Sequence, residues 1–290
     1  MGKYRPAVIL TLALTVFLAS CKGTSDDPVT PGPGPGPETK SWVVSTIAGY
    51  GIASGEGGNP DNDDATEATF NSPAGIAVDS SGNLYVADSG NNRIRKIAIS
   101  STGVVGAVST LAGTGTAGFA DTAAAGADPA VNPAVVATFN GPQGIAVDSS
   151  GENLYVAGTF SHIIRKVVIS TGAVSTIAGT AGTSGSANND VATAATFNGP
   201  TGVAVDSSGN LYVADKDNHL IRKIAISSTG VVGAVSTFAG TGSGKETYKD
   251  RFSFPVGVAV DSSDNLYVAD KANNRIRKII ISTKVGSTLA

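Results

Sequence analysis

The sequence predicts an all-β protein, a β-propeller of four blades with four strands each. The motif Pro-x-Gly-(Ile/Val)-Ala-Val-Asp begins at Pro73, Pro142, Pro200 and Pro255. A long internal repeat of this kind is typical of propellers and solenoids, in which neighbouring repeats bury one another's apolar faces. The 37 glycines and 15% charged residues also suit a chain of short strands joined by tight turns.

Each repeat contains four short segments of strand character. In the first copy they are 75–79, 84–88, 93–99 and 108–112. The first segment alternates glycine or alanine with branched residues, which is typical of a strand buried on both faces near a central axis. The third mixes apolar and basic residues, as expected of a strand farther out. A phenylalanine lies three residues before each repeat proline, and we expect it to fill the space between neighbouring blades.

The number of fourth strands raises the question of ring closure. Five segments have this sequence, at 43–48, 108–112, 174–178, 235–239 and 285–290, although four blades need only four. We expect a closed ring of four blades, in which the entering strand brings Trp42 close to the last blade at 276–281. Closure removes the exposed edges of a sheet. The alternative is an open arc, or part of a six-bladed ring that another chain or a continuation would complete.

The first 41 residues are expected to lie outside this fold. Lys3 and Arg5 precede the apolar run 7–19, which is too short for a membrane span. The run ends in Leu-Ala-Ser-Cys21, which resembles the lipobox of bacterial lipoproteins. That resemblance implies cleavage before Cys21, lipidation of this cysteine and a membrane anchor. The other interpretation is an ordinary secretory signal followed by a chance cysteine.

A tether follows the only cysteine in the chain. Residues 22–40 contain a Pro-Gly repeat from Pro31 to Pro37, which predicts an extended, solvated linker. Lys22 is not the aspartate associated with retention at the inner membrane, and Ser25-Asp26-Asp27 resembles an acidic surface-export signal. We therefore expect a signal peptide at 1–20, a lipidated tether at 21–41 and a propeller at 42–290. We expect the protein to be anchored in a bacterial outer membrane, where the acidic run would allow exposure on the cell surface.

The repeats resemble the NHL-repeat family. The runs that carry the resemblance are Pro-x-Gly-Ile-Ala-Val-Asp, Gly-Asn-Leu-Tyr-Val-Ala-Asp and Asn-Arg-Ile-Arg-Lys, nearly intact at 73–97 and 255–279 and clear at 200–224. The copy at 142–167 departs from them, with Glu152 inserted, Gly158 in place of an aspartate, and Phe-Ser-His at 160–162. The resemblance implies a propeller that acts as a binding platform for proteins or, in some eukaryotic members, RNA, although some related propellers are enzymes.

Two sets of repeated aspartates are candidate metal or catalytic carboxylates. The first is Asp79, Asp148, Asp206 and Asp261, and the second is Asp88, Asp215 and Asp270. The competing interpretation is that each aspartate caps a turn, because its short carboxylate bonds to nearby backbone amides. We favour turn capping and expect neither a bound metal nor a cofactor.

Basic residues recur at one phase of the repeat and form a possible basic surface. They are Arg95, Lys96, Arg165, Lys166, Arg222, Lys223, Arg277 and Lys278. Such a surface would attract an acidic partner. The alternative, which we favour, is a solvated strand whose cations pair with the repeat aspartates. The net charge of −3 makes nucleic acid an unexpected partner.

The two histidines, His162 and His219, occupy equivalent positions and could face each other in neighbouring blades. A zinc enzyme needs at least three protein ligands, and these are the only histidines of the chain. We therefore expect binding rather than catalysis, with protein or glycan partners held by the variable loops at 50–69, 114–138, 180–196 and 241–251. A lyase or lactonase that uses aspartates and a divalent metal, and a purely structural spacer, remain as alternatives.

Overall fold

The computed structural model describes residues 44–50, 61–122, 136–242 and 251–289. The predicted signal peptide, Cys21, the tether and Trp42 lie outside the described residues, as do parts of three of the four variable loops. Among the described helices, none is long and apolar enough to span a membrane. The fold is described below for the compact unit that begins at Ser45.

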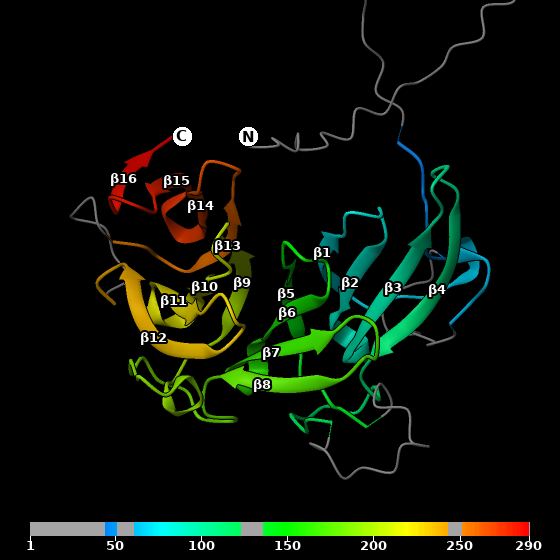
Figure 1. The fold of residues 1–290 in the computed structure, drawn as a ribbon, viewed down its shortest axis with the longest axis horizontal. Coiled ribbons are helices and arrows are strands. Elements are labelled where there is room, and N and C mark those ends of the chain that lie inside the picture. The colour runs from blue at the N-terminus through cyan, green and yellow to red at the C-terminus, as the bar shows by residue number, and fades with distance from the viewer. Residues whose placement is uncertain (1–43, 51–60, 123–135, 243–250, 290) are drawn as a thin grey trace, which may run out of the picture. The chain divides into compact units, whose positions relative to one another are not determined.

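Four antiparallel sheets of four strands confirm the predicted all-β blades (Figure 1). Within each sheet the strands lie side by side in chain order, so every blade is a simple meander. Blade 1 contains β1 (Pro73–Val78), β2 (Leu84–Asp88), β3 (Arg93–Ile99) and β4 (Val105–Ala112); blade 2 contains β5 (Pro142–Val147), β6 (Asn153–Gly158), β7 (Ile163–Val168) and β8 (Val174–Ala178). Blade 3 contains β9 (Pro200–Val205), β10 (Leu211–Asp215), β11 (Leu220–Ile226) and β12 (Val232–Ala239); blade 4 contains β13 (Pro255–Val260), β14 (Asn265–Asp270), β15 (Arg275–Ile280) and β16 (Val285–Thr288).

Short 3-10 turns join the second and third strands of every blade. They are η2 (Ser89–Asn91), η4 (Thr159–Ser161), η6 (Lys216–Asn218) and η7 (Lys271–Asn273). Each turn ends in a left-handed residue, namely Asn92, His162, His219 or Asn274, with φ between 51° and 60°. Asparagine and histidine tolerate this conformation better than most residues, which explains why these types recur here.

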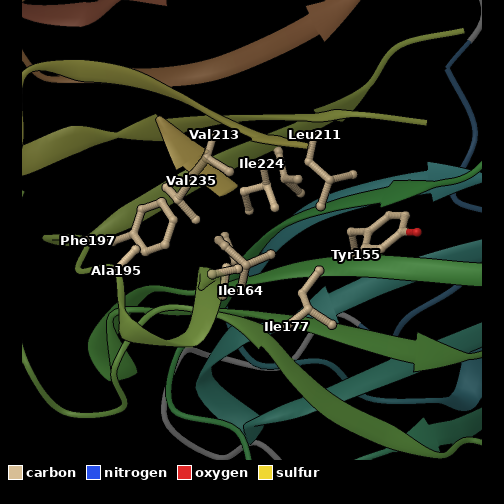
Figure 2. Close-up of a cluster of buried hydrophobic side chains, with 13 residues drawn as sticks. Tyr155, Ile164, Ile177, Ala195, Phe197, Leu211, Val213, Ile224 and Val235 are labelled. Atoms are coloured by element: carbon tan, nitrogen blue, oxygen red, sulfur yellow. The ribbon is translucent and has the colours of Figure 1, made fainter. Parts of the chain in front are cut away.

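The hydrophobic core lies between blades rather than inside them. Figure 2 shows the interface of blades 2 and 3, where Tyr155 and Ile164 of one blade face Leu211 and Val213 of the next. Phe197, from the segment that links the blades, is fully buried in this interface. Phe139 and Phe252 have the same role at the neighbouring interfaces, so the predicted inter-blade phenylalanines are confirmed.

The prediction of a closed four-bladed ring is wrong, and the open arc is confirmed. The inner strands contact one another in the order β1, β5, β9 and β13, which leaves one face of blade 1 and one face of blade 4 without a neighbouring blade. In Figure 1 these two faces lie on either side of a gap in the arc. The open ends explain why Ile76 of blade 1 is 63% exposed, whereas its counterpart Ile145 is 8% exposed.

The entering segment does not complete blade 4. Residues Ser45–Tyr50 lie beside blade 1, where Gly49 N–H donates to Ala65 O at 2.8 Å and Tyr50 N–H donates to Ala68 O at 2.7 Å. The fourth strand of blade 4 is β16, which pairs with β15 through a short hairpin. Closing a short loop costs less conformational entropy than bringing the two chain ends together, so the local strand is favoured.

Glycines on the inner strands let adjacent blades approach closely. A Cβ built on Gly144 would lie 2.2 Å from Thr201 O of the next blade, and one built on Gly202 would lie 2.7 Å from Val256 O. The equivalent Gly257 of blade 4 faces no further blade, and its nearest neighbour would be Ala269 Cβ at 3.6 Å. The close approach of neighbouring inner strands therefore depends on the absence of a side chain at this position.

We predict that Gly144→Ala destabilises the protein while Gly257→Ala leaves its stability nearly unchanged. Overpacking against a fixed backbone carbonyl costs about 1–3 kcal/mol of unfolding free energy. Urea unfolding followed by far-ultraviolet circular dichroism measures the free energy of unfolding of both variants. If both variants lost the same unfolding free energy, the cost could not come from the close approach of Gly144 to the backbone of the next blade within one chain.

Candidate binding surface

The arginines of the predicted basic surface are buried, so this part of the prediction is wrong. Arg95, Arg165, Arg222 and Arg277 are at most 6% exposed. Each guanidinium lies over the ring of the preceding inter-blade phenylalanine, at 5.1–5.4 Å from the centroid. The paired lysines Lys96, Lys166, Lys223 and Lys278 are half-buried. Stacking on the aromatic face and pairing with a carboxylate offset the cost of removing the guanidinium from water, while each Nε makes no hydrogen bond.

Blade 3 shows the arrangement in full. Arg222 Nη1 donates to Asp215 Oδ2 at 2.9 Å and to Thr196 O, also at 2.9 Å. Asp215 also accepts from Asn198 N–H at 2.7 Å, which ties the linker before the blade to its second strand. Burial raises the pKa of Asp215, and these hydrogen bonds oppose that shift. The second set of repeated aspartates therefore holds arginines and linkers in place, so the prediction that it caps turns is wrong. The pairing with arginine occurs as expected, but in a buried strand and not in a solvated one.

Blade 2 reaches the same result with a different carboxylate. Gly158 replaces the strand aspartate, and Asp121 of the preceding linker takes its place, with Arg165 Nη2 at 2.7 Å from Asp121 Oδ1. Thr176 Oγ1 also donates to Asp121 at 3.0 Å. In blade 1 the linker residue Asp61 and the strand residue Asp88 both pair with Arg95. Asp121 thus supplies the carboxylate that the second repeat lacks at Gly158.

The first set of repeated aspartates caps hairpin turns, as predicted. Asp79 Oδ1 accepts from the N–H groups of Ser81 and Asn83, each at 2.9 Å, and Tyr85 Oη donates to Asp79 Oδ2 at 2.9 Å. At Asp261, the N–H and side chain of Asn265 are the main cause that lowers the carboxyl pKa to about 2. Among the described residues, no three acidic, histidine or cysteine side chains gather as a metal site would require. These carboxylates are engaged by their own turns.

The histidines do not face each other; each joins its blade to the next. Gly199 N–H donates to His162 Nδ1 at 3.1 Å, and Phe254 N–H donates to His219 Nδ1 at 3.0 Å. Asn92 accepts in the same way from Gly141 N–H at 3.0 Å. We call this contact the inter-blade latch. Its acceptor is the left-handed residue after the 3-10 turn, and its donor is the residue before the repeat proline.

The linkers between blades share one hydrogen-bonded frame. In the linker before blade 3, which is described throughout, Gly185 N–H donates to Phe197 O at 3.0 Å and Ala187 N–H donates to Thr196 Oγ1 at 2.9 Å. In the linker before blade 2, Gly118 and Ala120 make the equivalent bonds to Phe139 O and Thr138 Oγ1, at 2.9 and 2.8 Å. In these two linkers, a common frame presents the differing residues at the same phase of the blade.

We call the side of the blades that carries the linkers and the 3-10 turns the linker face. In a meander the fourth strand ends, the first strand begins and the second strand turns into the third on this same side. Four large aromatic side chains of the described residues are exposed here: Tyr50 at 56%, Phe119 at 51%, Phe160 at 63% and Phe254 at 42%. Tyr50 and Phe119 lie in the predicted loops 50–69 and 114–138, whereas Phe160 and Phe254 lie outside the predicted loops. The signal was available at Phe160, where the repeat motif breaks down.

A concave region also lies along the inner strands. A hollow of about 350 Å³ follows the axial side of the four blades, with Ile76, Ile145, Val203 and Val258 among its lining residues. Its polar side chains are Gln143 and Thr201. Because Thr201 Oγ1 donates to Val256 O at 2.9 Å, it helps to join blades 3 and 4. The linker face offers more varied chemistry than this small-residue lining.

Comparisons with known proteins agree with the architecture. Residues 43–282 match the family described as the teneurin NHL domain. The NHL repeat-containing protein 2 of Bos taurus is 31% identical over 268 residues, covering 81% of this chain and 35% of that protein. Teneurin-4 of Homo sapiens is 28% identical over 247 residues, covering 78% of this chain and 8% of that protein. The chain therefore spans about a third or less of the length of these relatives.

Solved structures share the fold at low sequence identity. A Bacteroides thetaiotaomicron protein of unknown function has a TM-score of 0.53 at 21% identity, over 71% of this chain and 46% of that one. An auxiliary nutrient binding protein from Bacteroides ovatus has a TM-score of 0.50 at 18% identity, over 78% of this chain and 51% of that one. At this level of sequence identity, the comparison shows a shared fold and nothing further.

We predict that Asp121→Asn destabilises the protein and that adding Gly158→Asp restores it. The single variant removes the carboxylate that pairs with buried Arg165, at a cost of about 1–3 kcal/mol of unfolding free energy. Gly158 has φ −86° and ψ 87°, close to the −85° and 76° of Asp215, so aspartate fits this backbone. Urea midpoints of the single and double variants measure the rescue. A double variant no more stable than Asp121→Asn would contradict the exchange of carboxylates.

Proposed function

The chain belongs to the NHL-repeat family, and on this premise we propose that it is a bacterial cell-envelope lipoprotein that binds a protein or glycan partner through its linker face. One observation carries the proposal. The blades hold their linkers in a common hydrogen-bonded frame, while the residues on that frame differ from blade to blade. Variable residues on a rigid scaffold are the usual arrangement of a binding surface.

The exposed aromatics support the linker face over the opposite side. Phe160 and Phe254 lie next to the inter-blade latches, so their positions are fixed by contacts of the fold. The ring of Phe254 packs edge-on against His219 at 4.5 Å between centroids, and the ring of Phe160 lies over Gly141. Rigid aromatic residues supply large contact areas at low entropic cost, and they are enriched where proteins bind partners.

The predicted anchor gives this surface a place to act. A lipid on Cys21 and the extended tether at 22–40 would hold the blades at a distance from the bilayer, free to meet soluble or surface-bound partners. We propose the outer membrane as the site, with the blades on the cell surface, on the strength of Lys22 and the acidic run at 25–27. The repeated aspartates, which an enzymatic alternative would need, are committed to turns and arginine pairs.

We predict that the double variant Phe160→Ala, Phe254→Ala loses the partner. The immobilised chain is incubated with envelope extract of the source bacterium, and the retained proteins and glycans are compared with those of the unchanged chain. Loss of two aromatic anchors should weaken retention about tenfold or more. The matched control is Val104→Ala with Val231→Ala, two apolar residues at 63% and 65% exposure on the opposite side. Equal retention by both double variants would place the partner elsewhere.

We predict that labelled palmitate is incorporated into the chain and that Cys21→Ser abolishes incorporation. The chain contains no other cysteine that a lipid could use. Autoradiography after expression in a bacterial host measures the label, and fractionation of the envelope gives the location. Unchanged labelling of the Cys21→Ser variant, or release of an unlabelled protein into the medium, would overturn the lipoprotein assignment.

A further inference from the structure

We propose that the chain associates head to tail with a second copy of itself, the free face of blade 4 packing on the free face of blade 1. The inference is independent of the function proposed above. Each free face is the sequence and structural equivalent of one side of the three blade interfaces already described, so it continues that series. Such faces are complementary to each other by construction, as in any heterologous interface.

The face of blade 4 is a copy of faces that are buried elsewhere. Ile276 is 44% exposed, whereas its counterparts Ile94, Ile164 and Ile221 are fully buried against the following blade. Tyr267 is half-buried, whereas its counterparts Tyr85, Tyr155 and Tyr212 are at most 6% exposed. Beside them, the inner-strand Gly257 leaves the space that a neighbouring backbone fills at Gly75, Gly144 and Gly202.

The face of blade 1 supplies the complementary half. Ile76 and Val78 are 63% and 58% exposed at positions that the preceding blade covers in blades 2 and 3. Next to them lies an apolar groove of about 280 Å³, with Ile47, Phe70 and Val86 among its lining residues. At the internal interfaces, this place is filled by a tyrosine and an isoleucine of the preceding blade, such as Tyr155 and Ile164 in Figure 2. Blade 4 carries Tyr267 and Ile276 at these positions.

The two faces also hold the two halves of an inter-blade latch. Ser72 precedes the first repeat proline and has φ 49°, like the latch donors Gly141, Gly199 and Phe254 at 50–58°. Asn274 is the left-handed residue after η7, equivalent to the latch acceptor Asn92. Within the described part of the chain, Ser72 N–H and the Asn274 amide do not meet, because blade 1 and blade 4 end the arc. In the proposed pair, Ser72 N–H donates to Asn274 of the second copy.

The entering segment strengthens the match. Gly49 and Tyr50 bind the linker before blade 1 just as Gly179 and Thr180, which follow β8, bind the linker before blade 3. The segment therefore stands where a preceding blade would have its fourth strand. Blade 4 has a weak fourth strand of its own: the exposed β16 carries Gly286 where β8 carries Val174, which is 1% exposed.

Val44, directly before the entering segment, aligns with that glycine in sequence. In the proposed pair, the entering segment of one copy displaces β16 from blade 4 of the other copy and takes its place beside β15.

Sedimentation velocity of the full chain carrying Cys21→Ser, so that no lipid contributes to association, tests the proposal. We expect a mass of at least two chains. Ile276→Asp and Ile76→Asp should each give single chains, because each places a charge on one of the two faces; both residues are exposed in the single chain, so the fold is kept. Gly257→Ala, which keeps the fold by the argument given above, should weaken association more than tenfold. Val231→Asp on the opposite side is the control and should leave the mass unchanged.

Mixing the two single-chain variants separates a head-to-tail interface from a symmetric one. The intact blade 4 face of Ile76→Asp can still bind the intact blade 1 face of Ile276→Asp, so the mixture should form pairs of chains while neither variant does so alone. Single chains of the parent at every concentration would overturn the proposal. Equal dissociation by Val231→Asp, or no pairing in the mixture, would overturn it as well.

Discussion

The burial of one arginine in each blade is the constraint on which the rest of the structure depends. A guanidinium enclosed by protein needs both a carboxylate and further acceptors, and here the linker and the strands of the blade supply them together. The phenylalanine of the linker covers one flat face of the guanidinium. Linker carbonyls accept hydrogen bonds from the guanidinium nitrogens, and an aspartate supplies the counter-charge. Because the linker supplies two of these groups, it cannot leave the blade without exposing the charge.

This constraint turns a series of weakly structured segments into a rigid surface. Each linker is fixed at its phenylalanine and at the carbonyl of the residue before it, and the linkers before blades 2 and 3 are also fixed by their frame of hydrogen bonds. The inter-blade latches add a second row of fixed points nearer the axis. Differences in linker sequence therefore change the surface chemistry without changing the blades, which is the property that a binding platform requires.

Much of the blade architecture could be predicted from the sequence, because strand period, turn residues and repeat spacing are all local signals. Turn capping by Asp79 and its counterparts follows from the same local chemistry. Arg95 could not be placed, because a basic residue in a mixed strand has the same pattern whether it faces water or a distant phenylalanine. Ring closure was predicted wrongly for a related reason: it depends on a small angle between neighbouring blades, which no single residue determines.

The buried arginines also show how a repeat protein can drift in sequence without losing stability. In blade 3 the carboxylate comes from the strand, and the linker residue in the place of Asp121 is Asn188, whose amide oxygen accepts from Arg222. In blade 2 the carboxylate comes from the linker, because the strand has Gly158. Blade 1 carries both Asp61 and Asp88. These three states form a continuous mutational path, with blade 1 as the intermediate, along which the arginine is never left without a counter-ion.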